Sequence, residues 1–132
     1  MRVMLDTNVL ISALLIPGSK INAMMNCIFT QHQLVLSSYV VDELKRVVKR
    51  KFPQKENAIN KLLMLMSFEY VYTPNDIEGG LFDIRDEKDY PVLYTAIIED
   101  VDVLITGDKD FSDIDIERPE IMTPTDFIEK YL

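Results

Sequence analysis

Cysteine and histidine are almost missing from this chain: among 132 residues there is one of each, Cys27 and His32. A single cysteine cannot form an internal disulfide, so we expect the protein in a reducing compartment such as the cytoplasm. A single histidine excludes any catalytic pair of histidines within the chain. Together the two counts argue against a zinc site built from His and Cys.

Long hydrophobic runs are absent as well. No stretch approaches the ~20 apolar residues that a membrane-spanning helix needs, and the amino terminus lacks the basic, apolar and small-residue blocks of a signal peptide. There is no repeat, low-complexity tract or Ser/Gly linker, while 48% of the residues are hydrophobic. We therefore expect one domain with a single buried core, spanning residues 1–132.

Positive charge is scarce in the second half of the chain. Residues 1–75 carry nine Lys or Arg and five Asp or Glu, whereas residues 76–132 carry five Lys or Arg and seventeen Asp or Glu, within a net charge of −8. This division excludes a uniformly basic nucleic-acid footprint. A cluster of carboxylates in a folded protein repels itself and therefore favours binding of a divalent cation.

Short β-branched or apolar runs alternate with stretches of helical periodicity. We expect strands at 3–5, 34–36, 70–72, 103–106 and, weakly, 121–122. Helices are expected at 9–15, 19–30, from Ser37 or Ser38 to about 51, around 59–66, at 90–99, and after Thr123. This alternation predicts a three-layer α/β/α sandwich with a central, mostly parallel sheet. Met24, Met25, Met64 and Met66 recur at helical spacing and are predicted to be core residues.

Four acidic residues stand where the carboxyl edge of that sheet is expected. Asp6 and Asp108 follow strands, Glu43 lies in the first turns of a helix after a strand, and Asp89 begins the 90–99 helix. Ligands of open α/β sheets bind at this edge. One or two Mg²⁺ or Mn²⁺ ions, which take oxygen ligands, would relieve the repulsion between the acids. Such ions activate water for attack on a phosphodiester without any histidine.

These segments also carry a family resemblance. Residues 5–10 (LDTNVL), 37–44 (SSYVVDEL), 86–96 and 104–111 (LITGDKDF) resemble, in order and spacing, the motifs of the PIN domain. The resemblance covers essentially the whole chain and is closest to the VapC-type toxins of toxin–antitoxin pairs. It implies a sheet of about five parallel strands and a Mg²⁺- or Mn²⁺-dependent ribonuclease that leaves a 5′-phosphate and a 3′-hydroxyl.

By motif position, the resemblance places the catalytic metal ligands at Asp6, Glu43, Asp89 and Asp108. It places supporting polar residues at Asn8 and Thr106, while Asp86 and Asp110 are additional acids, and either Asp86 or Asp89 is the direct ligand of the third position. The implied partners are an RNA substrate, an antitoxin protein and a second copy of the chain.

One dense basic segment includes Lys45, Arg46, Lys49 and Arg50. It is interpreted either as a solvated helix end or as a contact for the RNA backbone. Two other functions stay open. One is a non-catalytic RNA- or protein-binding PIN module. The other is a haloacid-dehalogenase-like phosphatase with Asp6 as the nucleophile, although that mechanism wants an aspartate where this chain has Asn8.

Overall fold

A five-stranded, entirely parallel sheet forms the centre of the molecule in a computed structural model that describes residues 1–108, 111 and 114–132. The strands lie in the order β3-β2-β1-β4-β5. Their bounds are β1 (Arg2–Leu5), β2 (Gln33–Ser37), β3 (Glu69–Val71), β4 (Val103–Ile105) and β5 (Glu120–Met122). The predicted fold class is therefore confirmed, and β3 begins and ends one residue earlier than the sequence indicated.

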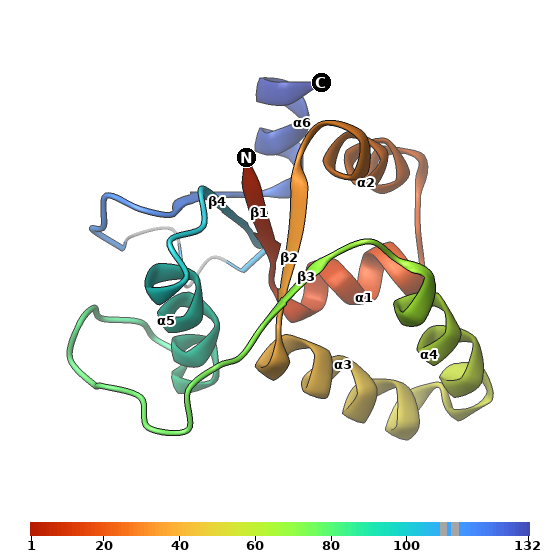
Figure 1. The fold of residues 1–132 in the computed structure, drawn as a ribbon, viewed down its shortest axis with the longest axis horizontal. Helices are drawn as coiled ribbons and strands as arrows, with labels where there is room; N and C mark the ends of the chain where they lie inside the picture. The colour runs from red at the N-terminus through yellow and green to blue at the C-terminus, as the bar shows by residue number, and fades with distance from the viewer. Residues whose placement is uncertain (109–110, 112–113) are drawn as a thin grey trace.

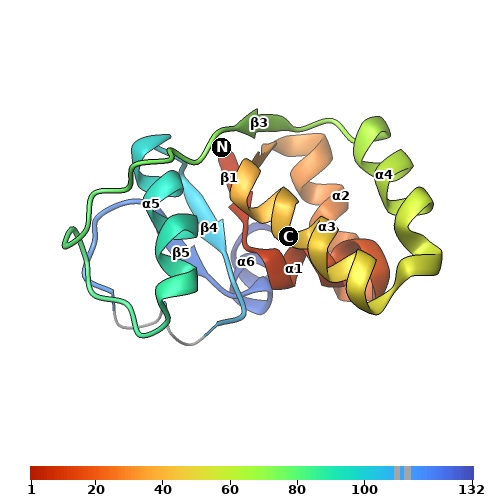
Figure 2. The ribbon, with the colours of Figure 1, turned by 90° about the horizontal axis from the view of Figure 1, so that it is seen from below.

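Helices connect the strands and cover the sheet. They are α1 (Thr7–Leu15), α2 (Ser19–Gln31), α3 (Ser38–Lys51), α4 (Glu56–Leu65), α5 (Tyr90–Ile98) and α6 (Pro124–Tyr131), with short 3₁₀ helices η1 (Pro53–Lys55) and η2 (Glu87–Asp89). Helix α5 lies on one side of the sheet and α1 to α4 lie on the other, as Figure 1 and Figure 2 show. Right-handed crossovers require this arrangement, because the chain reverses its direction across the sheet between β3 and β4.

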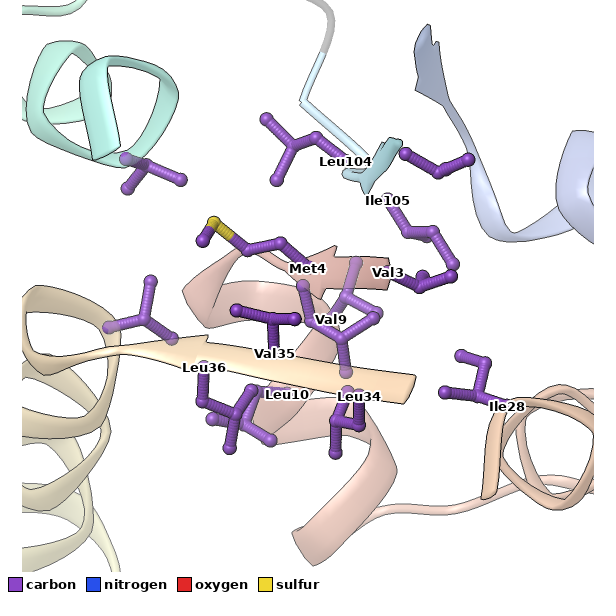
Figure 3. Packing of buried hydrophobic residues seen from close by; sticks show 14 of the residues in the cluster. Val3, Met4, Val9, Leu10, Ile28, Leu34, Val35, Leu36, Leu104 and Ile105 are labelled. Atoms are coloured by element: carbon purple, nitrogen blue, oxygen red, sulfur yellow. The ribbon is translucent and has the colours of Figure 1, made fainter. Parts of the chain in front are cut away.

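The central strands are buried on both faces, which explains why they read as continuous apolar runs. Val3, Met4 and Leu5 of β1 and Leu34, Val35 and Leu36 of β2 are almost entirely inaccessible to solvent. Figure 3 shows these side chains meeting residues from α1, α2 and β4. Of the four methionines predicted for the core, Met24 and Met25 are buried and Met66 packs partly against the core. The prediction is wrong for Met64, which lies on the exposed side of α4.

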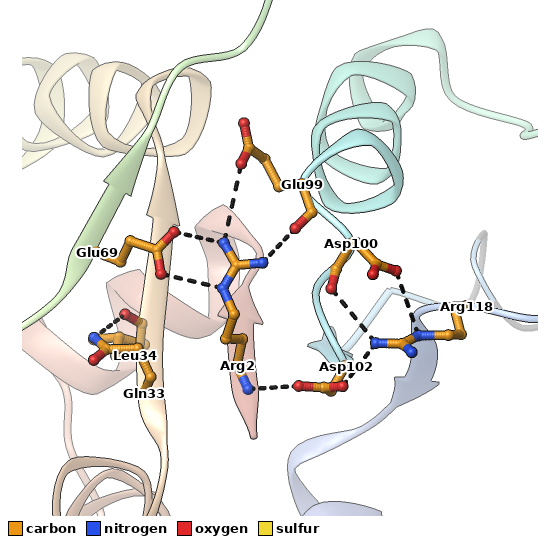
Figure 4. Close-up of polar contacts among 8 residues, drawn as sticks. All are labelled: Arg2, Gln33, Leu34, Glu69, Glu99, Asp100, Asp102 and Arg118. Atoms are coloured by element: carbon orange, nitrogen blue, oxygen red, sulfur yellow. Dashed lines mark hydrogen bonds and ion pairs between the residues drawn. The ribbon is translucent and has the colours of Figure 1, made fainter.

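Charged residues join the strands at the amino edge of the sheet (Figure 4). The guanidinium of Arg2 makes a two-pronged contact with the Glu69 carboxylate, at 3.1 and 2.5 Å, and also donates to the backbone carbonyl of Glu99. The backbone N–H of Arg2 donates to Asp102 Oδ2 at 2.7 Å, and Arg118 pairs with Oδ1 of the same carboxylate at 2.7 Å. The amino ends of β1, β3 and β4 are thus held together by opposite charges.

Side-chain caps mark the points where the chain passes from a strand into a helix. Ser37 Oγ accepts the N–H of Val40 at the start of α3, and Thr123 Oγ1 accepts the N–H of Asp126 at the start of α6. Ser38, the alternative cap, instead accepts the N–H of Thr73 at 2.9 Å. Because the strands are parallel, these helix starts gather at the carboxyl edge of the sheet.

Within the described part of the chain, no helix taken alone has the length and apolar character to cross a membrane; α1 and α2 reach that threshold only as a pair bent by 107°.

Leu36→Ala should lower the free energy of unfolding by about 2–5 kcal/mol, because it leaves a cavity at the centre of the sheet. Leu36 is 0% exposed, whereas Leu65, on the surface of α4, is 74% exposed. Leu65→Ala is therefore the matched control and should change stability by less than about 0.5 kcal/mol. Urea unfolding of both variants measures the difference, and equal losses would contradict the assigned core.

Candidate active site at the carboxyl edge of the sheet

Asp6 lies at the junction between β1 and α1, and it is 5% exposed. Its backbone N–H donates to the carbonyl of Ile105 on β4, which fixes the main chain. Its side chain is the N-cap of α1, where Oδ1 accepts the N–H of Val9 at 3.0 Å. The positive end of the helix thus faces this carboxylate and partly offsets the cost of burying it.

Thr106 connects Asp6 to the segment that carries Asp108. Its hydroxyl donates to Oδ2 of Asp6 and accepts the backbone N–H of Asp108 at 3.0 Å. The backbone N–H of Thr106 donates to Met122 on β5 at 2.8 Å, and the side chain is buried. The hydroxyl therefore positions one predicted acid and the backbone of another, which is consistent with the supporting role predicted for Thr106.

Glu43 approaches this pair from α3. It is half-buried, and its Oε2 accepts a hydrogen bond from Thr7 Oγ1 at 3.2 Å. Thr7 is the first residue of α1, directly after Asp6. The side chain of Glu43 is consequently tied to the same helix start that Asp6 caps.

Asp89 and Asp86 occupy different surroundings on η2. Asp89 is half-buried, with its Oδ2 inaccessible to solvent. Asp86 is exposed and caps η2, since its Oδ1 accepts the N–H of Lys88 at 3.0 Å. Of the two, Asp89 has the more enclosed carboxylate, which agrees with its choice as the third acid, and its role as a ligand stays a prediction.

Tyr39 lies between Glu43 and η2. Its hydroxyl donates to the carbonyl of Lys88 at 3.0 Å. Burial raises the pKa of the Tyr39 phenol, and the charges of Glu43, Asp89 and Asp86 raise it further while Arg46 acts in the opposite direction. These four charged groups therefore all act on one phenol.

The electrostatics of Asp6 show that the acids act on one another. Burial is the largest effect and raises the pKa of its carboxyl. The hydrogen bonds from Thr106 and Val9 lower that pKa, and the negative charges of Asp108 and Glu43 raise it again, so that the balance is upward from the ordinary 3.8. Asp6, Glu43 and Asp108 thus share one electrostatic environment.

The donor set fits a hard divalent cation, because it consists of oxygen atoms and its carboxylates repel one another. In the residues that the structure describes, no group of three or more His, Cys, Asp or Glu side chains is placed to hold an ion. Mg²⁺ is ordinarily held by one or two carboxylates and several waters. A shared ion at Asp6, Glu43, Asp89 and Asp108 therefore stays a prediction, supported by the chemistry of the donors.

The other predicted residues have less defined positions. Asn8 is exposed on the first turn of α1, and Asp110 lies outside the described residues.

The four basic residues predicted to contact RNA are all exposed on α3: Lys45, Arg46, Lys49 and Arg50. Helical spacing places Arg46 and Arg50 on the same side of α3 as Glu43. The two lysines lie on another side of the helix. Lys45 lines a hollow of about 540 Å³ between α3, α4 and β3.

A smaller hollow of about 270 Å³ opens beside Asp108. Its lining includes Thr106 and Gly107 from the segment after β4, and Met122, Thr123 and Asp126 from β5 and the start of α6. Of the four predicted ligands, Asp108 is the one in this described lining.

Sequence reasoning missed Thr7 and Tyr39. The sequence offers one indication for each residue: Thr7 is next to Asp6 in the chain, and Tyr39 is one helical turn before Glu43. Neither indication reveals the partner, because Thr7 contacts a residue 36 positions away and Tyr39 one 49 positions away.

Asp6→Asn should raise the melting temperature at neutral pH when no divalent metal is present. Asn retains the cap of α1 and removes a buried charge that Glu43 and Asp108 repel. Since the pKa of the acid is higher in the folded state, wild-type stability falls as the pH rises through the titration of Asp6. The advantage of the variant should therefore grow as the pH rises through the titration of Asp6 and disappear below pH 3.8, the ordinary pKa of the group.

Thermal unfolding in EDTA across this pH range measures the effect. Asp76→Asn, at an exposed position in the loop before η2, is the control and should leave the melting temperature unchanged. A lower melting temperature for Asp6→Asn at neutral pH would contradict the assigned environment.

Comparison with known proteins identifies the family. The family model of the PIN domain matches residues 2–110, a range that includes all four acids. An uncharacterized protein of Methanocaldococcus jannaschii is 30% identical over 147 residues, which cover 98% of this chain and 91% of that protein.

Two solved structures share the fold. A chain of VapBC2 from Rickettsia felis, bound to a DNA fragment from its promoter, matches with a TM-score of 0.70 at 21% identity, covering 92% of this chain and 97% of its own. A chain of FitAcB from Neisseria gonorrhoeae matches with a TM-score of 0.67 at 17% identity, and the match covers 93% of this chain and 98% of that one. The resemblance noted in the sequence is thereby confirmed: the chain belongs to the PIN domain family.

Proposed function

We propose that this protein is a divalent-metal-dependent endoribonuclease and the toxin of a toxin–antitoxin pair. The observation that carries the proposal is the state of Asp6: a nearly buried carboxylate, fixed by Val9 and Thr106, on which Glu43 and Asp108 exert their negative charges. A residue that only caps a helix needs no acidic side chains nearby, whereas a site that binds a cation needs several. Membership of the PIN domain family supports the nuclease interpretation.

Asp6, Glu43, Asp89 and Asp108 would hold the ion, Mg²⁺ or Mn²⁺. When bound, such an ion lowers the pKa of an attacking water and stabilises the charge on the leaving oxygen of a phosphodiester. The chain's own contribution is placement. Thr106 holds Asp6 and the backbone of Asp108, and Thr7 holds Glu43, so the carboxylates keep their positions as substrate enters.

RNA would approach across α3. Its phosphates are repelled by the acids, and Arg46 lies near enough to Tyr39 for its charge to affect the phenol. We propose that Arg46, together with Arg50 one turn later, attracts the backbone of RNA towards the site, while Lys45 and Lys49 contribute more generally. The exposure of all four residues supports this role.

The proposed partner is an antitoxin protein. Its support is the fold shared with chains of VapBC2 and FitAcB, of which the first is described as bound to a promoter fragment. We also propose that the chain forms a dimer or higher oligomer. We place it in the cytoplasm, in agreement with the buried free thiol of Cys27.

A second candidate is a PIN module that binds RNA or protein without cleavage. The exposed basic residues of α3 would suit it as well, since they could hold RNA without any cleavage. The two functions differ in their response to a chelator, because binding by a non-catalytic module needs no cation. The phosphatase alternative has less support, since the family match and Asn8 both argue against an aspartyl-phosphate mechanism.

Glu43→Gln should reduce Mn²⁺-dependent cleavage of a mixed-sequence RNA by about 100-fold or more, because it removes one of the charges that would hold the ion. Asp42→Asn is the matched control, since it neutralises the neighbouring, exposed acid of the same helix and should retain activity. EDTA should abolish cleavage by the wild type. Undiminished cleavage by Glu43→Gln, or full wild-type activity in EDTA, would refute the proposed function.

Arg46→Gln should raise the KM for RNA and leave kcat nearly unchanged, because it removes a contact with phosphate rather than with the reacting group. The slope of log affinity against log salt should fall by about one unit. Lys20→Gln, an exposed basic residue on α2, is the control. A fall in kcat at constant KM would show that Arg46 does not guide substrate.

A further inference from the structure

Tyr39 contacts two parts of the site that are far apart in the chain. Its ring projects from the first turns of α3, one turn before Glu43, and its hydroxyl donates to the carbonyl of Lys88 at 3.0 Å. Lys88 immediately precedes Asp89 in η2. A single phenol therefore bridges the helix that carries one predicted ligand and the 3₁₀ turn that carries another.

The segment that leads to η2 is tied to the start of α3 through Thr73, whose N–H donates to Ser38 Oγ, and again at η2 through the bond of Tyr39. Between β3 and η2 the chain runs from residue 72 to residue 86 without a helix or strand. The hydroxyl of Tyr90 donates to the carbonyl of Glu78 and accepts the N–H of Leu81, which ties this loop to the start of α5. Those bonds organise the loop internally, whereas the bond of Tyr39 joins η2 to α3.

Like charges oppose this junction. Glu43 lies one turn after Tyr39 on α3, and Asp86 and Asp89 lie within two residues of the Lys88 carbonyl that the hydroxyl bonds. The charges of all three acids act on the phenol, and that of Arg46 acts in the opposite direction. Without a counter-ion the carboxylates repel one another and tend to separate η2 from α3. A neutral hydroxyl donating to a backbone carbonyl opposes the separation without adding charge to the site.

We propose that Tyr39 is a positioning residue for the metal site: by bonding the Lys88 carbonyl it holds η2 against α3 and thereby places the Asp89 carboxylate opposite Glu43. The inference rests on the proposed function, because it concerns the same ion. It adds a residue that touches neither the ion nor the RNA and acts through the placement of a ligand.

Tyr39→Phe tests the proposal, because it keeps the ring and removes only the hydroxyl. Titration calorimetry with MnCl₂ alone should show binding about 10-fold weaker than in the wild type. Hydrogen exchange of the metal-free variant should be faster at the amides of Lys88 and Asp89, which donate to Asp86. The metal-free melting temperature should stay nearly unchanged. Tyr72→Phe, an exposed tyrosine after β3, is the control and should behave as the wild type.

A double variant separates positioning from a general effect on the fold. On an Asp89→Asn background, Tyr39→Phe should cause no further loss of Mn²⁺ affinity, because the carboxylate that it positions is already gone. Equal losses with and without Asp89 would overturn the proposal, as would wild-type affinity and exchange in Tyr39→Phe. A wild type that binds no Mn²⁺ would refute the proposed function as well, so the two failures are distinguishable.

Discussion

The hydrogen bond from Thr106 to the buried carboxylate of Asp6 is the interaction on which the rest of this site depends. It joins the ends of β1 and β4, which are neighbours in the sheet although 100 residues separate the two side chains. The same hydroxyl accepts the N–H of Asp108, so one threonine sets the direction of both segments. Helix α1 supplies the remaining donor through Val9. Asp6 can therefore be buried with its charge, but only while these three elements keep their relative positions.

The two edges of the sheet use charge in opposite ways. At the amino edge, Arg2 and Arg118 form ion pairs with Glu69, Asp100 and Asp102, and the strands are held together by attraction. At the carboxyl edge, acids lie beside hydroxyl donors, and the acids repel one another. A bound cation would relieve that repulsion. Attraction and repulsion between charges thus occur at opposite ends of the same strands. This arrangement allows the carboxyl edge to carry acids that repel one another without loss of the fold.

Most of the fold was predictable because strand and helix periods alternate cleanly and caps such as Thr123 are local signals. The sheet edge that gathers Asp6, Glu43 and Asp108 followed from the same reasoning, since parallel strands end together. Two kinds of feature were not predictable. Met64 has the spacing of a core residue, but α4 packs through Ile59 and Leu63 and exposes the face that carries it. The contacts of Thr7 and Tyr39 depend on how α1 and η2 approach α3, which no local pattern encodes.

The cap that Asp6 provides to α1 also limits how this chain can change over evolutionary time. If the proposed cleavage were lost in a lineage, the negative charge at this position could be lost with it, yet the first turn of the helix would still require an acceptor for Val9. Asn, Ser and Thr meet that requirement, whereas Ala and the larger apolar residues leave a buried amide unsatisfied. Relatives that lack the acid should therefore retain a short polar residue here, because the start of the helix needs an acceptor whether or not the protein cleaves RNA.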